Sequence, residues 1–524
     1  MSAVPPFVER VRSALGDERL HVALGRATEA LRSRRASAFA SLEDSDRVRD
    51  LARKAKLEVL ADLASQLQRF EERLVANGVE VHWAETGEEA NRLVLEIARR
   101  HGVKRIVKSK SMATEETHLN PALERAGMDV VETDLGEYIV QLNQDRPSHI
   151  ILPIIHLTRE DVGAVMHRRI QVPLSDDPRT LAGFARAKLR EEFLRADMGI
   201  TGANFGVVET GTICLVTNEG NGRMVTTLPR VHVAVMGIEK LVPTLEDLDL
   251  FLRLLARSAT GQKITTYTTL LRGPRRPGDE CGPEAMHVIL LDNGRSRLLA
   301  GDDAEILGCI RCGACLNACP IYKSIGGHAY GDTYPGPVGA IVTPGLRGLH
   351  GWSELPAAST LCGACRDVCP VRLDIPRMLL GLRRETVRTE KTPLGLRLGL
   401  KAFGWIAPRP KLYRAAAAAA RRLVRARARE GWVRRLPGLG GGWTQARDLR
   451  APAATTFQEQ WTHRQQTARA TGSTPGASAG GAGGAGVRRQ QAHKPEAASG
   501  AGLTPAERAG GPGGAAQHPP ARRR

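Results

Sequence analysis

The chain has 524 residues, 42% of them hydrophobic and 4% aromatic, with a formal net charge of +19. The charge is unevenly placed, because residues 391–524 hold 24 Lys and Arg against 5 Asp and Glu, whereas residues 1–390 hold 51 basic and 51 acidic side chains. A neutral body with few aromatic residues argues against a nucleic-acid groove there. No apolar run long enough for a transmembrane helix is present. The N-terminal stretch lacks the apolar core of a secretory signal, so a cytoplasmic protein is predicted.

The first half of the chain predicts a helical segment followed by an α/β domain. Residues 1–77 are expected to be helical, because apolar residues recur at close to a 3.6 period over 46–77. Over residues 78–298 short apolar runs alternate with helical patterns such as 88–101, which Thr86 would cap. Strands separated by helices predict crossover connections and a largely parallel sheet. The predicted strands are 79–83, 105–108, 128–132, 149–153, 212–217, 231–236 and 287–291.

The composition changes at about residue 299. Residues 299–390 are rich in Cys, Gly and Pro and predict an α-helical di-cluster ferredoxin-type domain, with a helix over 375–387 beside the cysteines. Residues 391–470 form a basic, partly helical segment, and residues 471–524 form a tail expected to be disordered. We expect the basic segment either to dock on an acidic partner or anionic lipid through a helix over 423–432, giving a peripheral membrane contact, or to be a solvated tail.

Seven of the nine cysteines lie close together in the sequence, in two motifs that each end in Cys-Pro. In a reducing compartment such clusters are typical of metal ligands. Ser359 stands where the first cysteine of the second motif would be. The remaining two cysteines, Cys214 and Cys281, are expected to be buried, inert thiols. The first motif consists of Cys309, Cys312, Cys315 and Cys319, and the second of Cys362, Cys365 and Cys369.

The spacing is typical of ferredoxins, in which the fourth cysteine of each run ligates the other cluster. One centre, a [4Fe–4S] cluster, is therefore expected to take Cys309, Cys312, Cys315 and Cys369. The other takes Cys319, Cys362 and Cys365 and is one ligand short. It is either a [3Fe–4S] cluster or a [4Fe–4S] cluster completed by Ser359, water or another residue. Structural zinc is the alternative, but seven cysteines divide poorly among four-ligand sites.

Two regions of the α/β domain carry polar residues where a ligand could bind. The strand end at 107–111 has two lysines before a helix start, which favours either an anion site or a solvated, well-capped strand end. Gly-rich turns on both sides of strand 212–217 favour either a ligand site or simple hairpin turns. Glu209 is a candidate base. The candidate anion pocket comprises Lys108, Ser109, Lys110, Thr210, Gly211, Thr212, Asn218 and Asn221.

Four stretches carry a family resemblance: GVVETGTICLVTNEGNGRMVTTLPRVHVAVMGIEKLVPTLEDL, KSKSMATEETHLN, CIRCGACLNACPIY and STLCGACRDVCPV. Over roughly residues 40–460 the chain resembles the lactate-utilisation iron–sulfur proteins, the B subunits of three-part L-lactate oxidation complexes. The resemblance implies a LUD-type α/β domain similar to sugar-isomerase and CoA-transferase folds, with a small-anion or nucleotide-like pocket at the strand ends. It also implies two [4Fe–4S] clusters, the second without an assigned fourth protein ligand. The implied partners are a cysteine-rich subunit and a small α/β subunit.

Three functions are compatible with these observations. The leading one is an electron-transfer subunit, the iron–sulfur component of an L-lactate dehydrogenase-type complex that makes pyruvate. The second is a substrate-binding catalytic subunit for a small 2-hydroxy acid, with Glu209 as base and Lys108 or Lys110 holding the carboxylate. The third is a nucleic-acid-binding or regulatory protein with structural iron–sulfur clusters, which the neutral body opposes.

Overall fold

The computed structural model describes residues 5–389, 394–437, 441, 443–444 and 447–471. The chain divides into two compact units, Met1–Leu412 and Tyr413–Arg524. Within the described ranges no helix has both the length and the apolar character needed to cross a membrane. The tail predicted to be disordered lies outside the described residues, and the five-part domain division of the sequence stays a prediction.

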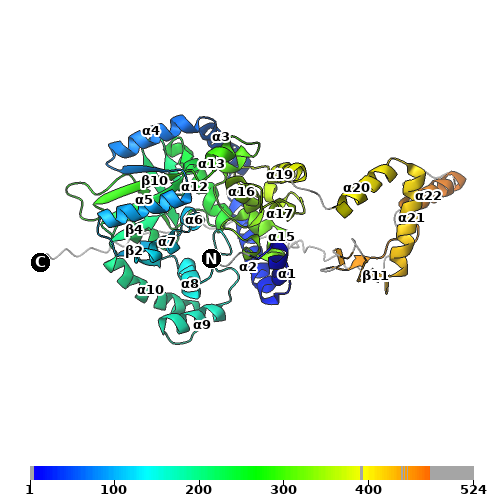
Figure 1. Ribbon diagram of the computed structural model, residues 1–524, viewed down its shortest axis with the longest axis horizontal. Coiled ribbons are helices and arrows are strands. Elements are labelled where there is room, and N and C mark those ends of the chain that lie inside the picture. The colour runs from blue at the N-terminus through cyan, green and yellow to red at the C-terminus, as the bar shows by residue number, and fades with distance from the viewer. Residues whose placement is uncertain (1–4, 390–393, 438–440, 442, 445–446, 472–524) are drawn as a thin grey trace, which may run out of the picture. The chain divides into compact units, whose positions relative to one another are not determined.

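The chain begins with four helices, as the periodicity predicts. The apolar pattern over 46–77 is divided at Asp62, whose φ of −129° and ψ of 38° interrupt the helix. Helix α2 packs on the cysteine-bearing part of the chain, while α4 packs on the main sheet (Figure 1). The four helices are α1 (Phe7–Leu15), α2 (Glu18–Ala40), α3 (Ser45–Ala61) and α4 (Leu63–Ala76).

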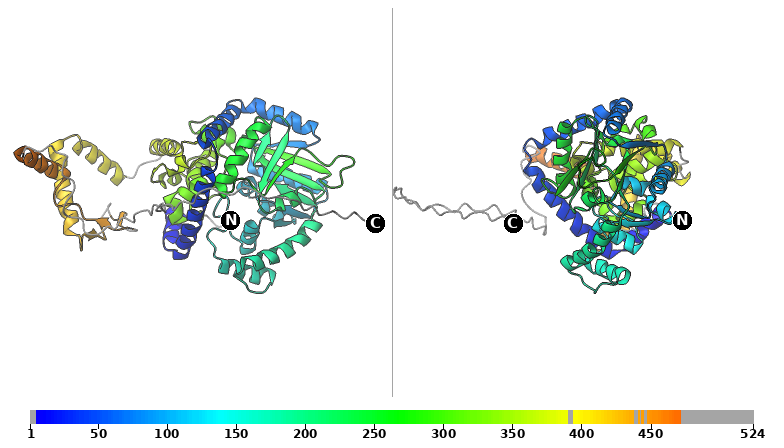
Figure 2. Two further views of the ribbon diagram at one scale, coloured as in Figure 1. Left: turned by 180° about the vertical axis from the view of Figure 1, so that it is seen from behind. Right: turned by 90° about the vertical axis from the view of Figure 1, so that its left-hand side faces the viewer.

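The main sheet has six strands, all parallel, in the order β1-β10-β7-β4-β2-β3. Its strands alternate between two buried faces: Val233 and Val235 of β7 pack towards α5 and α7, and Ala234 and Met236 pack towards α4. Helices therefore cover both faces of the sheet (Figures 1 and 2). The strands are β1 (Glu80–Ala84), β2 (Arg105–Lys108), β3 (Asp129–Glu132), β4 (Met198–Thr201), β7 (Val231–Gly237) and β10 (Ala285–Leu291).

A second, mixed sheet has the order β8-β5-β6-β9 and includes an antiparallel hairpin of β5 and β6. The predicted strand 212–217 belongs to this sheet. Its strands are β5 (Phe205–Val207), β6 (Thr212–Thr217), β8 (Leu241–Val242) and β9 (Tyr267–Leu271). The helices of the α/β part are α5 (Gly87–Arg100), α6 (Met112–Glu116), α7 (Leu119–Arg125), α8 (Leu135–Asn143), α9 (Arg159–Ile170), α10 (Pro178–Arg195), α11 (Asn221–Val225), η1 (Ile238–Lys240), α12 (Leu245–Ala259) and α13 (Arg295–Leu299). Thr86 caps α5 by accepting the amide of Glu89, as predicted.

One predicted strand, 149–153, is wrong. These residues form a buried irregular turn, in which the ring of His149 accepts the amides of Ile151 and Leu152 at 3.0 and 3.1 Å. The amide of Ser148 donates to the carbonyl of Pro153 at 2.8 Å. An apolar run can be buried without a strand partner when a side chain satisfies its amides. His149 Nε2 lies 3.1 Å from Asn317 Oδ1, so the turn joins the α/β part to the cysteine-bearing part.

The cysteine-bearing part is helical, as predicted. Arginines of α2 and α3 hold its second cysteine motif: Arg35 donates to the carbonyl of Val368 at 2.7 Å and Arg49 to that of Cys369 at 2.7 Å. The elements are η2 (Ala304–Gly308), α14 (Ala314–Ala318), α15 (Pro320–Ile325), η3 (His328–Tyr330), α16 (Gly336–Arg347), α17 (Glu354–Ala357), α18 (Ala364–Asp367), α19 (Ile375–Thr389) and α20 (Leu394–Ile406).

The predicted basic helix over 423–432 is also wrong. The helix of this region ends at Ala426, and Trp432 instead pairs with Arg450 in a two-stranded sheet. Further along, Glu430 and Gly431 have φ values of 53° and 82°, which exclude a right-handed helix over the last part of the predicted range. Docking of this segment on lipid or an acidic partner stays a prediction. The elements are α21 (Pro410–Ala426), β11 (Trp432–Val433), β12 (Leu449–Arg450) and α22 (Phe457–Thr471).

Candidate metal centre and adjoining cavity

Thiols from both cysteine motifs lie near one another around Cys315. Burial raises the pKa of Cys315 well above its usual value, and the nearby thiols of Cys309, Cys312, Cys365 and Cys369 raise it further. Burial likewise raises the pKa of Cys312 to about 12, with Cys309 and Cys369 adding to it. Thiols of both motifs, Cys369 and Cys365 of the second among them, therefore lie near Cys315, and the division of the ligands between two clusters stays a prediction.

A second group forms around Cys365. Burial raises the pKa of its thiol to about 12, the thiol of Cys319 is the next largest cause, and the thiol of Cys362 makes a smaller contribution in the same direction. Burial also raises the pKa of Cys319, with a further contribution from Cys362. Cys319 of the first motif thus lies with the first two cysteines of the second.

The two cysteine motifs have the same backbone form. Arg311 and Gly313 have φ values of 58° and 74°, and the residues at the same places in the second motif, Leu361 and Gly363, have 54° and 84°. In the first motif the amide of Arg311 donates to Cys309 Sγ at 3.4 Å. In the second, the amide of Leu361 donates to Ser359 Oγ at 3.2 Å. Ser359 Oγ therefore takes the position that a cysteine sulfur has in the first motif.

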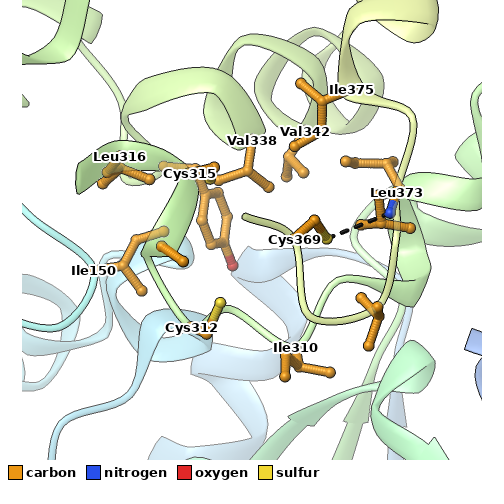
Figure 3. Packing of buried hydrophobic residues seen from close by; sticks show 14 of the residues in the cluster. Ile150, Ile310, Cys312, Cys315, Leu316, Val338, Val342, Cys369, Leu373 and Ile375 are labelled. Carbon is orange, nitrogen blue, oxygen red and sulfur yellow. Dashed lines mark hydrogen bonds between the residues drawn. The ribbon is translucent and has the colours of Figure 1, made fainter. Parts of the chain in front are cut away.

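Backbone amides also point at the last cysteine of each motif. The amide of Tyr322 donates to Cys319 Sγ at 3.5 Å and that of Leu373 donates to Cys369 Sγ at 3.3 Å. Because N–H donors stabilise the thiolate form, these contacts suit sulfur that carries negative charge. The dashed line in Figure 3 marks the contact of Leu373.

The two groups differ in exposure. Aliphatic side chains that include Ile310, Val338 and Ile375 surround Cys312, Cys315 and Cys369 (Figure 3). Cys362, by contrast, is exposed, and hydrogen bonds from the backbone amide of Ala364 and from Thr360 lower its pKa. Three of the four thiols of the first group are therefore buried and Cys309 is half-buried, whereas the second group reaches the surface at Cys362.

The spacing of the thiols fits a cluster better than a single ion. Tetrahedral zinc with bonds of about 2.3 Å would place its sulfur ligands about 3.8 Å apart. In the part of the chain that the structure describes, no three of the seven cysteines offer sulfur atoms within 4.8 Å of one another. The thiols also form no disulfide among the described residues. A multi-iron centre is larger than one ion and spreads its ligands further, so this donor set fits it.

Cationic side chains gather around the buried group. Burial lowers the pKa of Lys56 to about 7 and that of Lys240 to about 8, and the thiol of Cys309 is among the groups that oppose this shift in both. Arg35 lies near the thiols of Cys312 and Cys369. Arg311 is 7% exposed and stacks on the ring of Tyr334 with its guanidinium 4.7 Å from the ring centre. These cations would offset the negative charge of a thiolate-bound cluster.

A cavity of about 290 Å³ lies between the main sheet and the first cysteine motif. Its walls come from the carboxyl ends of β2, β4 and β7, the turn at 150–152, helix α12 and the residues Ile310 and Arg311. Three residues of the predicted anion pocket line it: Ser109, Lys110 and Asn218.

The other predicted pocket residues do not line this cavity. Lys108 is fully buried and its Nζ lies 2.6 Å from Glu132, so its charge is already paired. Thr210, Gly211 and Thr212 form the β5–β6 turn, where Asn77 donates to the carbonyl of Thr210 at 2.9 Å. Asn221 donates to Thr133 at 3.2 Å. Glu209 is exposed at the same turn and accepts the amide of Leu245 at 3.3 Å.

Sequence reasoning missed four residues of the cavity: Lys240, Arg295, Arg311 and Tyr334. Arg295 is 1% exposed and lies 2.9 Å from Glu116 and 2.6 Å from Glu239. The hydroxyl of Tyr334 donates to Glu116 at 2.7 Å, which joins α6 to the cysteine-bearing part. A lysine three positions after a buried strand was the available signal for Lys240, and the arginine inside Cys-Ile-Arg-Cys was the signal for Arg311.

The two isolated cysteines behave differently. Cys214 is buried in β6, as expected, and burial raises its pKa to about 12. The expectation for Cys281 is wrong, because this residue is exposed in the loop before β10. The loop from 273 to 284 is Gly-, Pro- and Arg-rich and contributes nothing to the hydrophobic core in its own right, which explains the exposure.

A parallel α/β domain followed by a helical module with two ferredoxin-type cysteine motifs defines an iron–sulfur protein. The family models agree: a LUD domain matches residues 67–291, a 4Fe-4S dicluster domain matches 305–373, and the C-terminal model of lactate utilisation protein B matches 386–466. The chain belongs to the lactate utilization protein B family. It is 44% identical to lactate utilization protein B of Shouchella clausii and 41% identical to that of Bacillus subtilis, in each case over 88% of this chain and 97% of the relative. An uncharacterized electron transport protein of Escherichia coli is 41% identical over the same shares.

Proposed function

We propose that this chain is the electron-transfer subunit of a complex that oxidises L-lactate to pyruvate. The observation that supports it most is the arrangement of the two thiol groups. One group is enclosed beside a cavity, and the other reaches the surface at Cys362. The names of the relatives, lactate utilization protein B and an electron transport protein, support the direction and the substrate.

We further propose the ligands of two [4Fe–4S] clusters. Cys309, Cys312, Cys315 and Cys369 would hold the buried cluster. Cys319, Cys362 and Cys365 would hold the second, with Ser359 Oγ as the fourth ligand. The shared backbone form of the two motifs and the matching amide contacts of Cys309 and Ser359 support this assignment.

The bound clusters would supply one-electron chemistry, and the protein's own groups determine where the electrons enter and leave. The amides of Arg311 and Leu373 hold the sulfur atoms of Cys309 and Cys369 in place. The aliphatic residues around Cys312 exclude water from the inner site. In the proposed arrangement Cys319 and Cys369 would each ligate the cluster of the other motif, and the packing of α14 against α18 would keep the two sites close together.

The partners belong to this proposal. A cysteine-rich subunit and a small α/β subunit would complete the complex, and one of them would dock over the exposed Cys362. Pull-down of the two subunits by the full chain, with a variant carrying Arg366→Glu beside that site, would test the docking. We expect weaker capture by the variant, and equal capture would place the partner elsewhere.

Iron and sulfide analysis with EPR on the anaerobically purified chain tests the cofactor assignment. We expect about eight irons per chain and signals of two interacting clusters after reduction. Ser359→Cys should keep both clusters, whereas Ser359→Ala should lose about one iron from the second and show the signal of an oxidised three-iron centre. Unchanged spectra in Ser359→Ala would exclude the serine as a ligand. Stoichiometric zinc in the wild type would overturn the electron-transfer function itself.

A further inference from the structure

The cavity beside the buried thiol group lies where open α/β sheets bind ligands. Ser109 follows β2, Gly202 follows β4 and Gly237 ends β7, so the cavity opens at the carboxyl ends of three neighbouring parallel strands. Ile310 and Arg311, from the loop between the first two cysteines, form the opposite wall. A ligand here would contact both the sheet and the cysteine loop.

Arg311 presents unused hydrogen-bond donors in this cavity. It is 7% exposed, and its Nε and Nη1 have no partner among the described residues. Among the described residues, Glu239 is the carboxylate near this guanidinium: its Oε1 lies 3.8 Å from Nη2, beyond hydrogen-bond distance, while its Oε2 lies 2.6 Å from Arg295 Nε, so Arg311 Nε and Nη1 still have no acceptor. Leaving guanidinium donors buried and unpaired is costly, so a bound acceptor at this place would be stabilised.

Lys240 provides a second cation. Its side chain lines the cavity and makes no hydrogen bond or ion pair with any residue that the structure describes. The other lysine of the cavity, Lys110, is paired with Glu137, so it offers less charge to a ligand. Two acidic residues also line the wall, but backbone amides bind both: Asp134 accepts from Lys110 and Glu219 accepts from Leu135.

The rest of the cavity limits the size and the chemistry of the ligand. Its volume of about 290 Å³ is just below the range for drug-sized ligands, about 300–1,000 Å³, which disfavours a dinucleotide. Ile150, Leu215 and Leu255 supply an apolar side. Asn204 and Thr217 supply polar groups near it. One or two cations, an apolar side and a few hydroxyl or amide groups fit a short aliphatic carboxylate that carries an oxygen next to its carboxyl group.

We propose that this cavity binds a short 2-hydroxy or 2-oxo acid, with Arg311 and Lys240 as the residues that hold its carboxylate. The identity of the acid, L-lactate or pyruvate, rests on the proposed function. The site itself does not, because it is derived from the cavity and its unpaired cations. The bound acid also lies beside the buried cluster, since the amide of Arg311 donates to Cys309 Sγ at 3.4 Å.

The site is tested on the full, cluster-loaded chain by anaerobic calorimetry with L-lactate and with pyruvate. The reduced protein is also followed by EPR with and without each acid. We expect saturable binding of at least one acid and a change in the signal of one cluster only. Lys240→Gln and Arg311→Gln should each weaken binding at least tenfold. Lys104→Gln is the matched control, because this lysine is exposed before the amino end of β2 and should leave binding unchanged.

The outcomes separate this proposal from the proposed function. Normal iron content with no heat and no spectral change for either acid in the wild type would overturn the binding site and leave the electron relay intact. Acid binding by a chain that holds zinc in place of iron would support the binding site and overturn the electron relay. Equal binding by wild type, Lys240→Gln and Arg311→Gln would also overturn the assignment of the two cations. If a variant fails to load iron, the wild-type measurements still decide whether the cavity binds an acid.

Discussion

The cysteine loops 309–319 and 359–369 have the same backbone form in different surroundings. Both place a left-handed residue before the second ligand position and a left-handed glycine after it. The first loop is closed in by aliphatic side chains and by the cations Lys56, Lys240 and Arg311, whereas the second exposes Cys362. The motif therefore determines the backbone form of each loop, and the elements packed around it determine how far the loop is exposed.

The largest expected difference between the two loops is the loss of protein stability when the cysteine at the same motif position is replaced. Cys312→Ala removes a thiol from the packed interior, so we expect the loss of the buried cluster and a decrease of roughly 3 kcal/mol or more in the free energy of unfolding. Cys362→Ala removes an exposed thiol at the same motif position and should lose the second cluster with a smaller decrease. Iron analysis and thermal unfolding under argon measure both effects. Equal destabilisation by the two substitutions would contradict the difference in burial.

The second-largest expected difference is in the rate at which a chelator removes iron from the two sites. An anionic chelator reaches the exposed site at Cys362 more easily than the enclosed site at Cys312, so we expect about half of the iron to be released at least tenfold faster than the rest. The time course of chelator absorbance gives the two phases. Ser359→Cys serves as the matched variant, because a fourth thiolate should slow the fast phase and leave the slow phase unchanged. A single phase would contradict the difference in exposure.

The smallest of the three expected effects is a change in the reduction potential of one cluster. Lys240 lies near Cys309, and its charge favours the more negative, reduced form of the buried cluster. Lys240→Met should therefore lower the potential of that cluster by on the order of 50 mV and leave the second cluster unchanged. A redox titration followed by EPR measures both potentials. Lys104→Met, at the far end of β2, is the control, and a shift of both clusters would indicate a change in the whole fold.

The cysteine spacing and the strand pattern were readable from the sequence because both are local. Ligands three residues apart lie on one turn, and a run of apolar residues bounded by turns predicts a buried strand whatever surrounds it. Strands β2 and β6 have the predicted bounds. The turn at 149–153 shows where this reasoning fails, since the ring of His149 satisfies amides that a strand partner would otherwise bind.

The predicted anion pocket shows the same limit of reasoning from local sequence, here for the residues of a site. Lys108 and Lys110 are two residues apart in the sequence, yet Lys108 is neutralised by Glu132 while Lys110 reaches the cavity. Thr210 and Glu209 belong to the β5–β6 turn, which packs near Asn77 and Leu245. Whether a polar residue is free to bind a ligand depends on its partners, and those partners come from distant parts of the chain.

The sequence by itself determined that this chain carries two ferredoxin-type cysteine motifs, a parallel α/β domain and a basic C-terminal segment, because each follows from short-range spacing, periodicity or composition. The tertiary structure alone decided which motif is enclosed and which reaches the surface. It also decided that Arg311 and Lys240 meet in one cavity beside the buried thiols. The physical reason is that burial and unpaired charge arise when residues far apart in the chain pack together, which no local pattern records.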